Sequence, residues 1–405
     1  MKDLIHKNIR EVAENYFKKS DIQEFNSFCE QLAYKTSPKD EASETNNKQS
    51  LIFKTQVDLL ITFASNRLEQ EKLVTLLLHL SKTAITIGEF STAIETAEKL
   101  AEITDGQKDY ENILANALLT IGETKSRQAE WETSFTHLRR AKELFLKKRD
   151  FIGAAKCENI IGTIYGDMGD LKQAIESFEE ALNLAQDKED FIMQGKVEVN
   201  LGIVNTILGK FDEALSFFRR SLLNFEKAGD NMRIAEIHQN LSMVYLKKED
   251  YDLASKEVDE AIAASRKINY LQELGISYIT KALIYTKIFD FTLANAFADK
   301  AMEVAYKLSD KLTIAEVYRI KGMIQRNLKN YTLAENFLLT SLRLNKEAGN
   351  QLNVAETSNE LGLLYRDMGR IKDSELRFKE ALEYFKQIEA EPEIVEIEAI
   401  MKLLK

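Results

Sequence analysis

The sequence predicts an all-α protein built from a repeated helical hairpin, and three observations support this fold class. Only 2 Pro and 16 Gly occur among 405 residues, and these are the residue types that disfavour helices most. Apolar residues follow helical spacing in most of the chain. Small residues recur every forty positions, starting at Gly122 and Gly162. A fixed period of this length is typical of a solenoid of stacked units, so we expect one array rather than several globular domains.

One complete hairpin lies between Asn200 and Leu222. Its first helical run ends at Gly209, and a second amphipathic run begins at Phe211. Gly202 and Ala214 lie twelve residues apart on the two sides of this break. Small side chains at both positions allow two antiparallel helices to approach closely.

The same positions recur in register along the chain. The small residues of the first helices are Gly122, Gly162, Gly202, Ser242, Ala282, Gly322 and Gly362. The small residues of the second helices are Ser134, Ala174, Ala214, Ala254, Ala294, Ala334 and Ser374. One further copy, a residue out of phase, contains Ser81, Phe90, Ala93 and Leu100. We therefore expect about eight hairpins in residues 71–389, with breaks near Gly88, Ala129, Gly169, Gly209, Glu249, Phe289, Lys329 and Gly369.

The order of small, aromatic and alanine positions at Gly162, Tyr165, Ala174, Phe178 and Ala181 resembles the tetratricopeptide repeat (TPR) family. The forty-residue period is longer than the family's common one, and is similar to the variant in Pins-type spindle-orientation adaptors and in many bacterial signalling proteins. The resemblance covers residues 71–389. It implies a right-handed α-solenoid that binds peptides or proteins as a scaffold, and it implies no single reaction.

The segment before the array reads as two paired helices and a connector. Residues 3–18 and 22–34 each place apolar side chains on one face. Residues 36–50 are polar and contain Pro38, which predicts a flexible acidic connector and a domain boundary after residue 50. A linking helix over residues 51–70 is apolar on more than one side, so we expect other helices to cover it twice.

The helices of the array have recognisable ends. An Asp or Asn, the residue types that cap helix N-termini, precedes most first helices, at Asp150, Asp190, Asp230, Asp310 and Asn350. The sixth copy departs from this pattern, with Tyr270 in that region. After Pro392, a last helix in residues 390–405 has one apolar face. Because the end of an array exposes apolar surface, we interpret this helix as a cap in preference to a partner-binding tail.

Composition excludes several classes of function. The net charge of −10 lacks the basic footprint of nucleic-acid binding. No apolar stretch is long enough to span a membrane, and the two cysteines, Cys29 and Cys157, form no disulfide or metal pattern. We expect a reduced, cytoplasmic protein. The four histidines have no acid or cysteine partner at catalytic or ligand spacing. The sequence therefore predicts no enzyme, no cofactor and no metal site.

A binding surface is expected on the concave side, which the first helices of a stacked array line. By resemblance to the TPR family, the groove positions lie three before and one, four and five after the small residue. The expected peptide-binding groove comprises Asn159, Thr163, Val199, Ile203, Gln239, Met243, Lys247, Ile279, Leu283, Lys287, Arg319, Met323, Arg326, Asn359 and Arg366. Its middle is apolar, amides recur along it, and cations gather near the C-terminal half. Such a surface suits an extended peptide better than a merely solvated helix face does.

The sequence allows two roles for Asn200 and Asn240. They either contact a ligand or stiffen the stack.

The partner is expected to be an extended protein or peptide segment with apolar residues and with acidic residues near Arg319, Arg326 and Arg366. The acidic connector residues Asp40, Glu41 and Glu44 could compete for the same arginines.

Two functions remain candidates. The first is a non-enzymatic adaptor or scaffold that captures a partner segment. The alternative is a peptide-responsive bacterial regulator that resembles Rap-type proteins in layout, with an N-terminal helical effector module controlled by the TPR array. The oligomeric state is not predicted by any pattern in the sequence.

Overall fold

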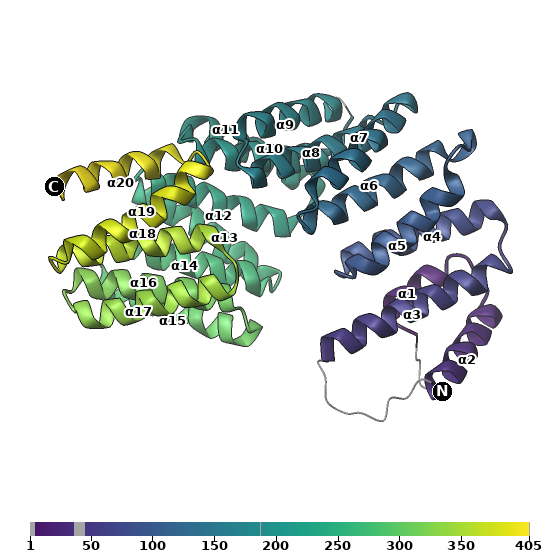
Figure 1. The fold of residues 1–405 in the computed structure, drawn as a ribbon, viewed down its shortest axis with the longest axis horizontal. Helices are drawn as coiled ribbons and strands as arrows, with labels where there is room; N and C mark the ends of the chain where they lie inside the picture. Colours follow the sequence, from purple (N-terminus) through teal and green to yellow (C-terminus); the bar gives the residue numbers. More distant parts are fainter. Residues whose placement is uncertain (1–4, 36–44, 187, 405) are drawn as a thin grey trace. The chain divides into compact units, whose positions relative to one another are not determined.

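Helices account for all the regular structure in the part of the chain that the structure describes (Figure 1). The computed structural model describes residues 5–35, 45–186 and 188–404, with backbone alone at residues 30–35 and 45–49. These residues form twenty α-helices and one 3-10 turn, and no strand. The all-α prediction is therefore confirmed.

The chain divides into two compact units. The first unit, Met1–Ile164, contains α1 (Lys7–Ala13), α2 (Lys19–Lys35), α3 (Thr45–Ser65), α4 (Gln70–Thr86), α5 (Phe90–Thr104), the 3-10 turn η1 (Lys108–Tyr110), α6 (Glu111–Arg127), α7 (Trp131–Lys147) and most of α8 (Phe151–Met168).

The second unit, Tyr165–Lys405, contains the remaining helices. They are α9 (Leu171–Ala185), α10 (Phe191–Ile207), α11 (Phe211–Ala228), α12 (Asn231–Lys247), α13 (Tyr251–Lys267), α14 (Leu271–Lys287), α15 (Phe291–Leu308), α16 (Lys311–Asn327), α17 (Tyr331–Glu347), α18 (Gln351–Asp367), α19 (Ile371–Gln387) and α20 (Glu391–Leu403). From α4 to α19 the helices follow one another as eight consecutive hairpins.

The small residues lie where the two helices of a hairpin cross. A Cβ atom on Gly202 would lie 2.7 Å from the Phe218 ring, and one on Gly322 would lie 2.6 Å from Leu338 Cγ. At Ser134, Ser242 and Ser374 the hydroxyl bonds across the crossing, and Ser242 Oγ donates to the carbonyl of Ala254 at 2.7 Å. Small side chains are therefore needed for close approach, as the repeat predicted.

Each expected break falls on a residue in the left-handed backbone region, which ends a helix. Gly209 has φ 71°, and at the same place in other hairpins Phe289 and Lys329 both have φ 63°. Most first helices are also capped as predicted: Asp190 accepts a hydrogen bond from the backbone N–H of Met193 at 2.8 Å. The exception is confirmed as well, because Tyr270 makes no side-chain cap at α14.

The helices before the array differ in extent from the prediction. α1 ends at Ala13, before the expected residue 18. α3 already begins at Thr45, inside the stretch expected to be a flexible connector. Residues 36–44, including Asp40, Glu41 and Glu44, lie outside the described residues. α3 is covered from two sides: its buried residues share one apolar cluster with residues of α1 and α2 and with residues of α4.

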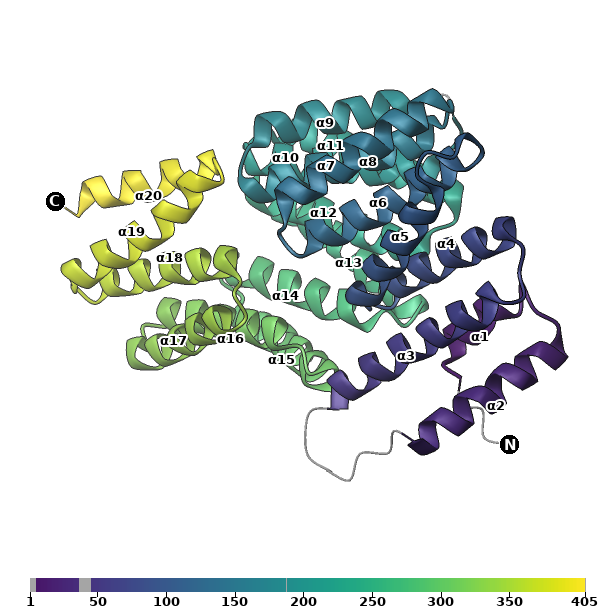
Figure 2. The same cartoon turned by 45° about the vertical axis from the view of Figure 1, so that its right-hand side comes forward.

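The last helix closes the C-terminal hairpin. α20 follows α19 and is drawn in yellow in Figure 2. Ile397 of α20 is fully buried in a cluster with Phe378 and Phe385 of α19 and Ala355 of α18. The helix therefore covers the apolar end of the array.

Candidate functional site

The first helices of the hairpins in the second unit, α10, α12, α14, α16 and α18, are the elements that position the candidate site. α12 contacts α14, α14 contacts α16 and α16 contacts α18, so equivalent positions of successive repeats become neighbours. We call the side chains at the expected groove positions of these five helices the inner surface. Asn159 and Thr163 belong instead to the first unit, where the Thr163 hydroxyl donates to the backbone carbonyl of Asn159 at 2.9 Å.

The apolar part of the inner surface runs over α10, α12 and α14. Val199, Met243, Ile279 and Leu283 are partly buried against the same core cluster, which leaves part of each side chain accessible. Ile203 is 42 % exposed. Met323 on α16, in contrast, is only 4 % exposed, so the accessible apolar strip ends before that helix.

The amides of the inner surface keep hydrogen-bonding capacity. The Gln239 side chain donates to the Thr280 hydroxyl at 2.5 Å, which joins α12 to α14. The other atom of that amide, Gln239 Oε1, is buried and has no hydrogen-bond partner among the described residues. The same holds for Asn359 Oδ1 on α18. Each atom is an unused acceptor, which a ligand would reach only if the side chains covering it moved.

Arg319 is engaged by carboxylates of its own chain. Its guanidinium lies 2.7 Å from Glu316 on the same helix and 3.0 Å from Glu356 on α18. Burial opposes its charge, but the two carboxylates outweigh burial and raise the pKa of Arg319 above the ordinary value. The side chain is 11 % exposed, so a ligand carboxylate would have to share this arginine with Glu356.

The two other candidate arginines are also paired. Arg326 lies 3.3 Å from Glu360 and 3.9 Å from Asp367. Arg366 lies 2.8 Å from Asp367 and is the most exposed of the three. Lys287 is exposed at the end of α14. The cations are therefore present where the sequence placed them, but four acids accompany the three arginines.

Sequence reasoning missed two of these acids, Glu316 and Glu356, which pair with Arg319. They occupy one register position, six residues before the small residue of α16 and α18, where α12 has Glu236. The signal was available in the repeat: the same position reads Lys196 in α10 and Ile276 in α14. Reading this register beside the predicted ones would have shown that Arg319 has neighbours of opposite charge.

Several buried polar atoms of the inner helices have no hydrogen-bond partner in the part of the chain that the structure describes. These atoms are Gln239 Oε1, Glu273 Oε1, Glu316 Oε1, Arg326 Nε and Asn359 Oδ1. A buried polar atom without a partner is costly, and folded proteins seldom keep one without a reason. Such atoms, on helices that also carry an apolar strip, suit the alternating polar and apolar groups of a peptide chain.

One candidate cation, Lys247, is paired with a distant part of the chain. Its ammonium forms an ion pair with Glu393 at the start of α20. Ile207, at the end of α10, packs into the apolar cluster that includes Ile394 of α20. The beginning of the last helix therefore lies against the ends of α10 and α12.

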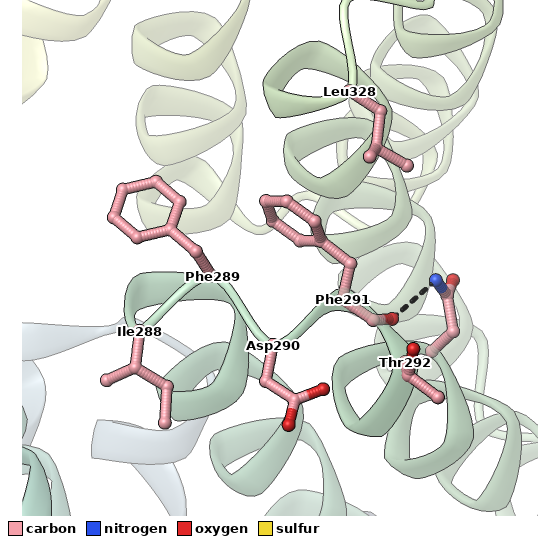
Figure 3. A pocket seen from close by; sticks show the side chains of 7 residues that line it. Ile288, Phe289, Asp290, Phe291, Thr292 and Leu328 are labelled. Carbon is pink, nitrogen blue, oxygen red and sulfur yellow. Dashed lines mark hydrogen bonds between the residues drawn. The ribbon is translucent and has the colours of Figure 1, made fainter.

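A separate shallow hollow lies beside the turn between α14 and α15 (Figure 3). Ile288, Phe289 and Leu328 surround it, and Phe289 is 69 % exposed. Its polar groups are used internally: Asp290 accepts a hydrogen bond from the backbone N–H of Leu293, and the Asn295 amide donates to the carbonyl of Phe291. The hollow offers an apolar surface but no converging polar groups.

The cysteines and histidines offer little chemistry. Burial raises the pKa of Cys29 to about 11 and that of Cys157 to about 12, so neither thiol is an activated nucleophile. His238 contacts Glu257 at 2.7 Å, with no cysteine or serine in the pair. Within the described residues there is no group of three potential metal ligands. Among the described helices, none combines the length and the apolar character needed to cross a bilayer.

Solved structures with the same fold extend over nearly the whole chain. Aspartyl phosphate phosphatase F from Bacillus subtilis is similar with a TM-score of 0.63 and 14 % identity, over 96 % of both chains. The apo form of the quorum sensor NprR from B. thuringiensis has a TM-score of 0.63 and 17 % identity, over 90 % of this chain and 97 % of NprR. A Rap protein complexed with competence and sporulation factor has a TM-score of 0.59 and 14 % identity, over 98 % of this chain and all of that one. At these identities the likeness concerns the fold.

No curated protein sequence matches this chain. The sequence pattern of the tetratricopeptide repeat matches residues 113–187, 194–267 and 313–387, which together make up more than half of the chain. These segments coincide with hairpins whose crossings, turns and caps have the geometry described above. The chain therefore belongs to the tetratricopeptide repeat family.

Proposed function

We propose that this protein is a non-enzymatic adaptor whose inner surface binds an extended segment of a partner protein or peptide. The observation that carries the proposal is that the first helices of the second unit combine an accessible apolar strip on α10, α12 and α14 with buried polar atoms that lack hydrogen-bond partners on α12, α14, α16 and α18. An extended segment brings both backbone hydrogen-bonding groups and alternating side chains, so it satisfies both kinds of surface at once. The Rap protein complexed with competence and sporulation factor supports this use of the fold.

The apolar residues of the partner would lie over Ile203, Met243, Ile279 and Leu283. Its acidic residues would lie near Lys247, Lys287 and Arg366, which are more accessible than Arg319. An acidic residue reaching Arg319 or Arg326 would exchange with Glu356 or Glu360, so these two arginines add selectivity more than affinity. Met243 would adapt to side chains of different shape.

Site-specific photo-crosslinking in cells of the native source tests this proposal. A photoreactive residue in place of Ile203, on the inner surface, should capture a partner that Met243→Arg abolishes. The matched control is a photoreactive residue at Leu223 of α11, which is 57 % exposed but lies on a second helix. Crosslinking from Leu223 with none from Ile203 would place the partner on the second helices of the hairpins and contradict the proposal.

The second candidate is a peptide-responsive regulator in which the N-terminal helices act on an effector. The observation in its favour is that similarity to Rap-type structures extends over 96–98 % of the chain, and so includes α1 to α3. In α2, Phe28 is 41 % exposed and lies beside Arg67 in a surface hollow. A crosslinker at Phe28 that captures a second protein, and loses it when the inner-surface partner is added, would favour this regulator over a simple adaptor.

A further inference from the structure

The start of α20 lies against residues of the inner surface that are far from α20 in the sequence. Glu393 forms an ion pair with Lys247 at the end of α12. Pro392 packs against the turn after α10, because a Cβ atom on Gly209 would lie 2.9 Å from the proline Cγ. Ile207 and Ile394 belong to one apolar cluster. α20 therefore does more than cover the end of α19.

The turn before α20 continues this contact. The carbonyl oxygen of Gln387 would lie 2.5 Å from a Cβ atom on Gly169, so only glycine permits this approach. The carboxylate of Glu356 interacts electrostatically with both Lys247 and Glu393. Residues 387–394 thus lie among charged groups of α12 and α18, at one end of the inner surface.

The chemistry of this segment matches the partner that we proposed for the surface. Residues 388–397 read IEAEPEIVEI, in which acidic and apolar residues alternate. The ion pair that holds it is accessible, since the Lys247 side chain is 32 % exposed and that of Glu393 is 24 % exposed. Accessible ion pairs contribute little, so this contact is easily exchanged. Ile397, fully buried against α19, anchors the rest of the helix.

We propose that residues 387–394 occupy part of the partner site intramolecularly, and that an acidic and apolar segment of the partner displaces them from Ile207, Gly209 and Lys247. This inference rests on the proposed function and adds its regulation. Because the intramolecular segment reduces the fraction of chains with a free site, it lowers the apparent affinity for any segment of the same kind.

The test uses the full chain and a labelled synthetic peptide with the sequence of residues 386–405. Glu393→Lys repels Lys247 and should release the internal segment, so this variant should bind the peptide roughly tenfold more tightly than the original chain. Lys247→Glu should bind only a peptide that carries the Glu393→Lys change. The double variant restores an ion pair within the chain and should return to weak binding. Glu396→Lys, at an exposed position of α20, is the matched control and should change nothing.

Hydrogen exchange of the amides in residues 390–403 provides a second readout. It should be faster in Glu393→Lys than in the double variant, with equal thermal stability showing that both are folded. Equal peptide binding by the original chain and Glu393→Lys, with unchanged exchange, would reduce α20 to a structural cap and overturn the inference. If the amount of partner crosslinked at Ile203 is the same with and without Glu393→Lys, only this inference is overturned. Peptide binding to Glu393→Lys without any partner at Ile203 would overturn only the proposed function.

Discussion

The first helices of the two units differ in charge at one position of the same repeat frame. In the unit Met1–Ile164, the position six residues before the small residue is Asn116 in α6 and Lys156 in α8. Lys82 donates to the Asn116 amide at 2.9 Å, and burial together with the charge of Lys156 lowers the pKa of Lys82. In the unit Tyr165–Lys405 this position is acidic in α12, α16 and α18, whereas α10 has Lys196 and α14 has Ile276 there. The small residues therefore specify the hairpin, while the inner positions vary in charge from repeat to repeat.

Substitution of a small residue at a helix crossing should have the largest effect on the free energy of unfolding, and the effect should be equal in both units. A Cβ atom on Gly122 would lie 2.6 Å from Leu138, and one on Gly362 would lie 2.6 Å from Phe378. Gly122→Leu and Gly362→Leu should each lower the free energy of unfolding by about 3 kcal/mol through overpacking. Urea denaturation of the full chain measures both.

Gly166→Ala is the matched control, because no atom lies within 4 Å of the position its Cβ would take. It should be neutral or stabilise by about 0.5–1 kcal/mol, since alanine favours a helix. A large loss in one unit with none in the other would show that the two arrays do not share one packing rule.

The inner charges predict a difference between the units. Arg319→Gln in α16 leaves Glu316 and Glu356 without their cation, and should cost about 2 kcal/mol. This is less than for a fully buried pair, because the Glu356 side chain is 36 % exposed. Lys156→Gln, at an exposed position of α8, should cost less than about 0.5 kcal/mol.

A double variant, Arg319→Gln with Glu356→Gln, separates the ion pair from general packing. It should recover part of the loss, because it removes the unpaired carboxylate together with the arginine. Chemical denaturation of Arg319→Gln, Glu356→Gln and the double variant gives the coupling energy between the two side chains. If Arg319→Gln and Lys156→Gln cost the same, the ionic network of the second unit adds nothing to its stability.

The fold was largely predictable from sequence because it depends on local register. Phe289 takes a left-handed backbone at a turn although it is not glycine, and only its position in the repeat predicted this. The pairing of Arg319 with Glu356 was predictable in principle, since stacking brings positions of adjacent repeats together. The contact of Pro392 with Gly209 was not, because it depends on how far the helices curve over several repeats, and small changes at each crossing determine that curvature.

The smallest predicted effect concerns pH, and it follows from the acidic character of the second unit. Glu273 of α14 is 5 % exposed, and burial, with a contribution from Glu236, raises its pKa from 4.5 to about 7. Between about pH 4.5 and pH 7, Glu273 is therefore protonated in the folded chain and ionised in the unfolded chain. The stability from this proton is fully present below about pH 4.5 and is lost as the pH rises through about 7.

Glu273→Gln removes this dependence, because the amide has no proton to lose. Relative to the original chain it should gain about 1–2 kcal/mol at pH 8 and almost nothing at pH 4.5. Urea denaturation at several pH values measures the gain, with Glu260→Gln on the exposed side of α13 as control. A Glu273→Gln variant that keeps the full pH dependence of the unfolding free energy would mean that Glu273 does not hold the proton, and would contradict the prediction.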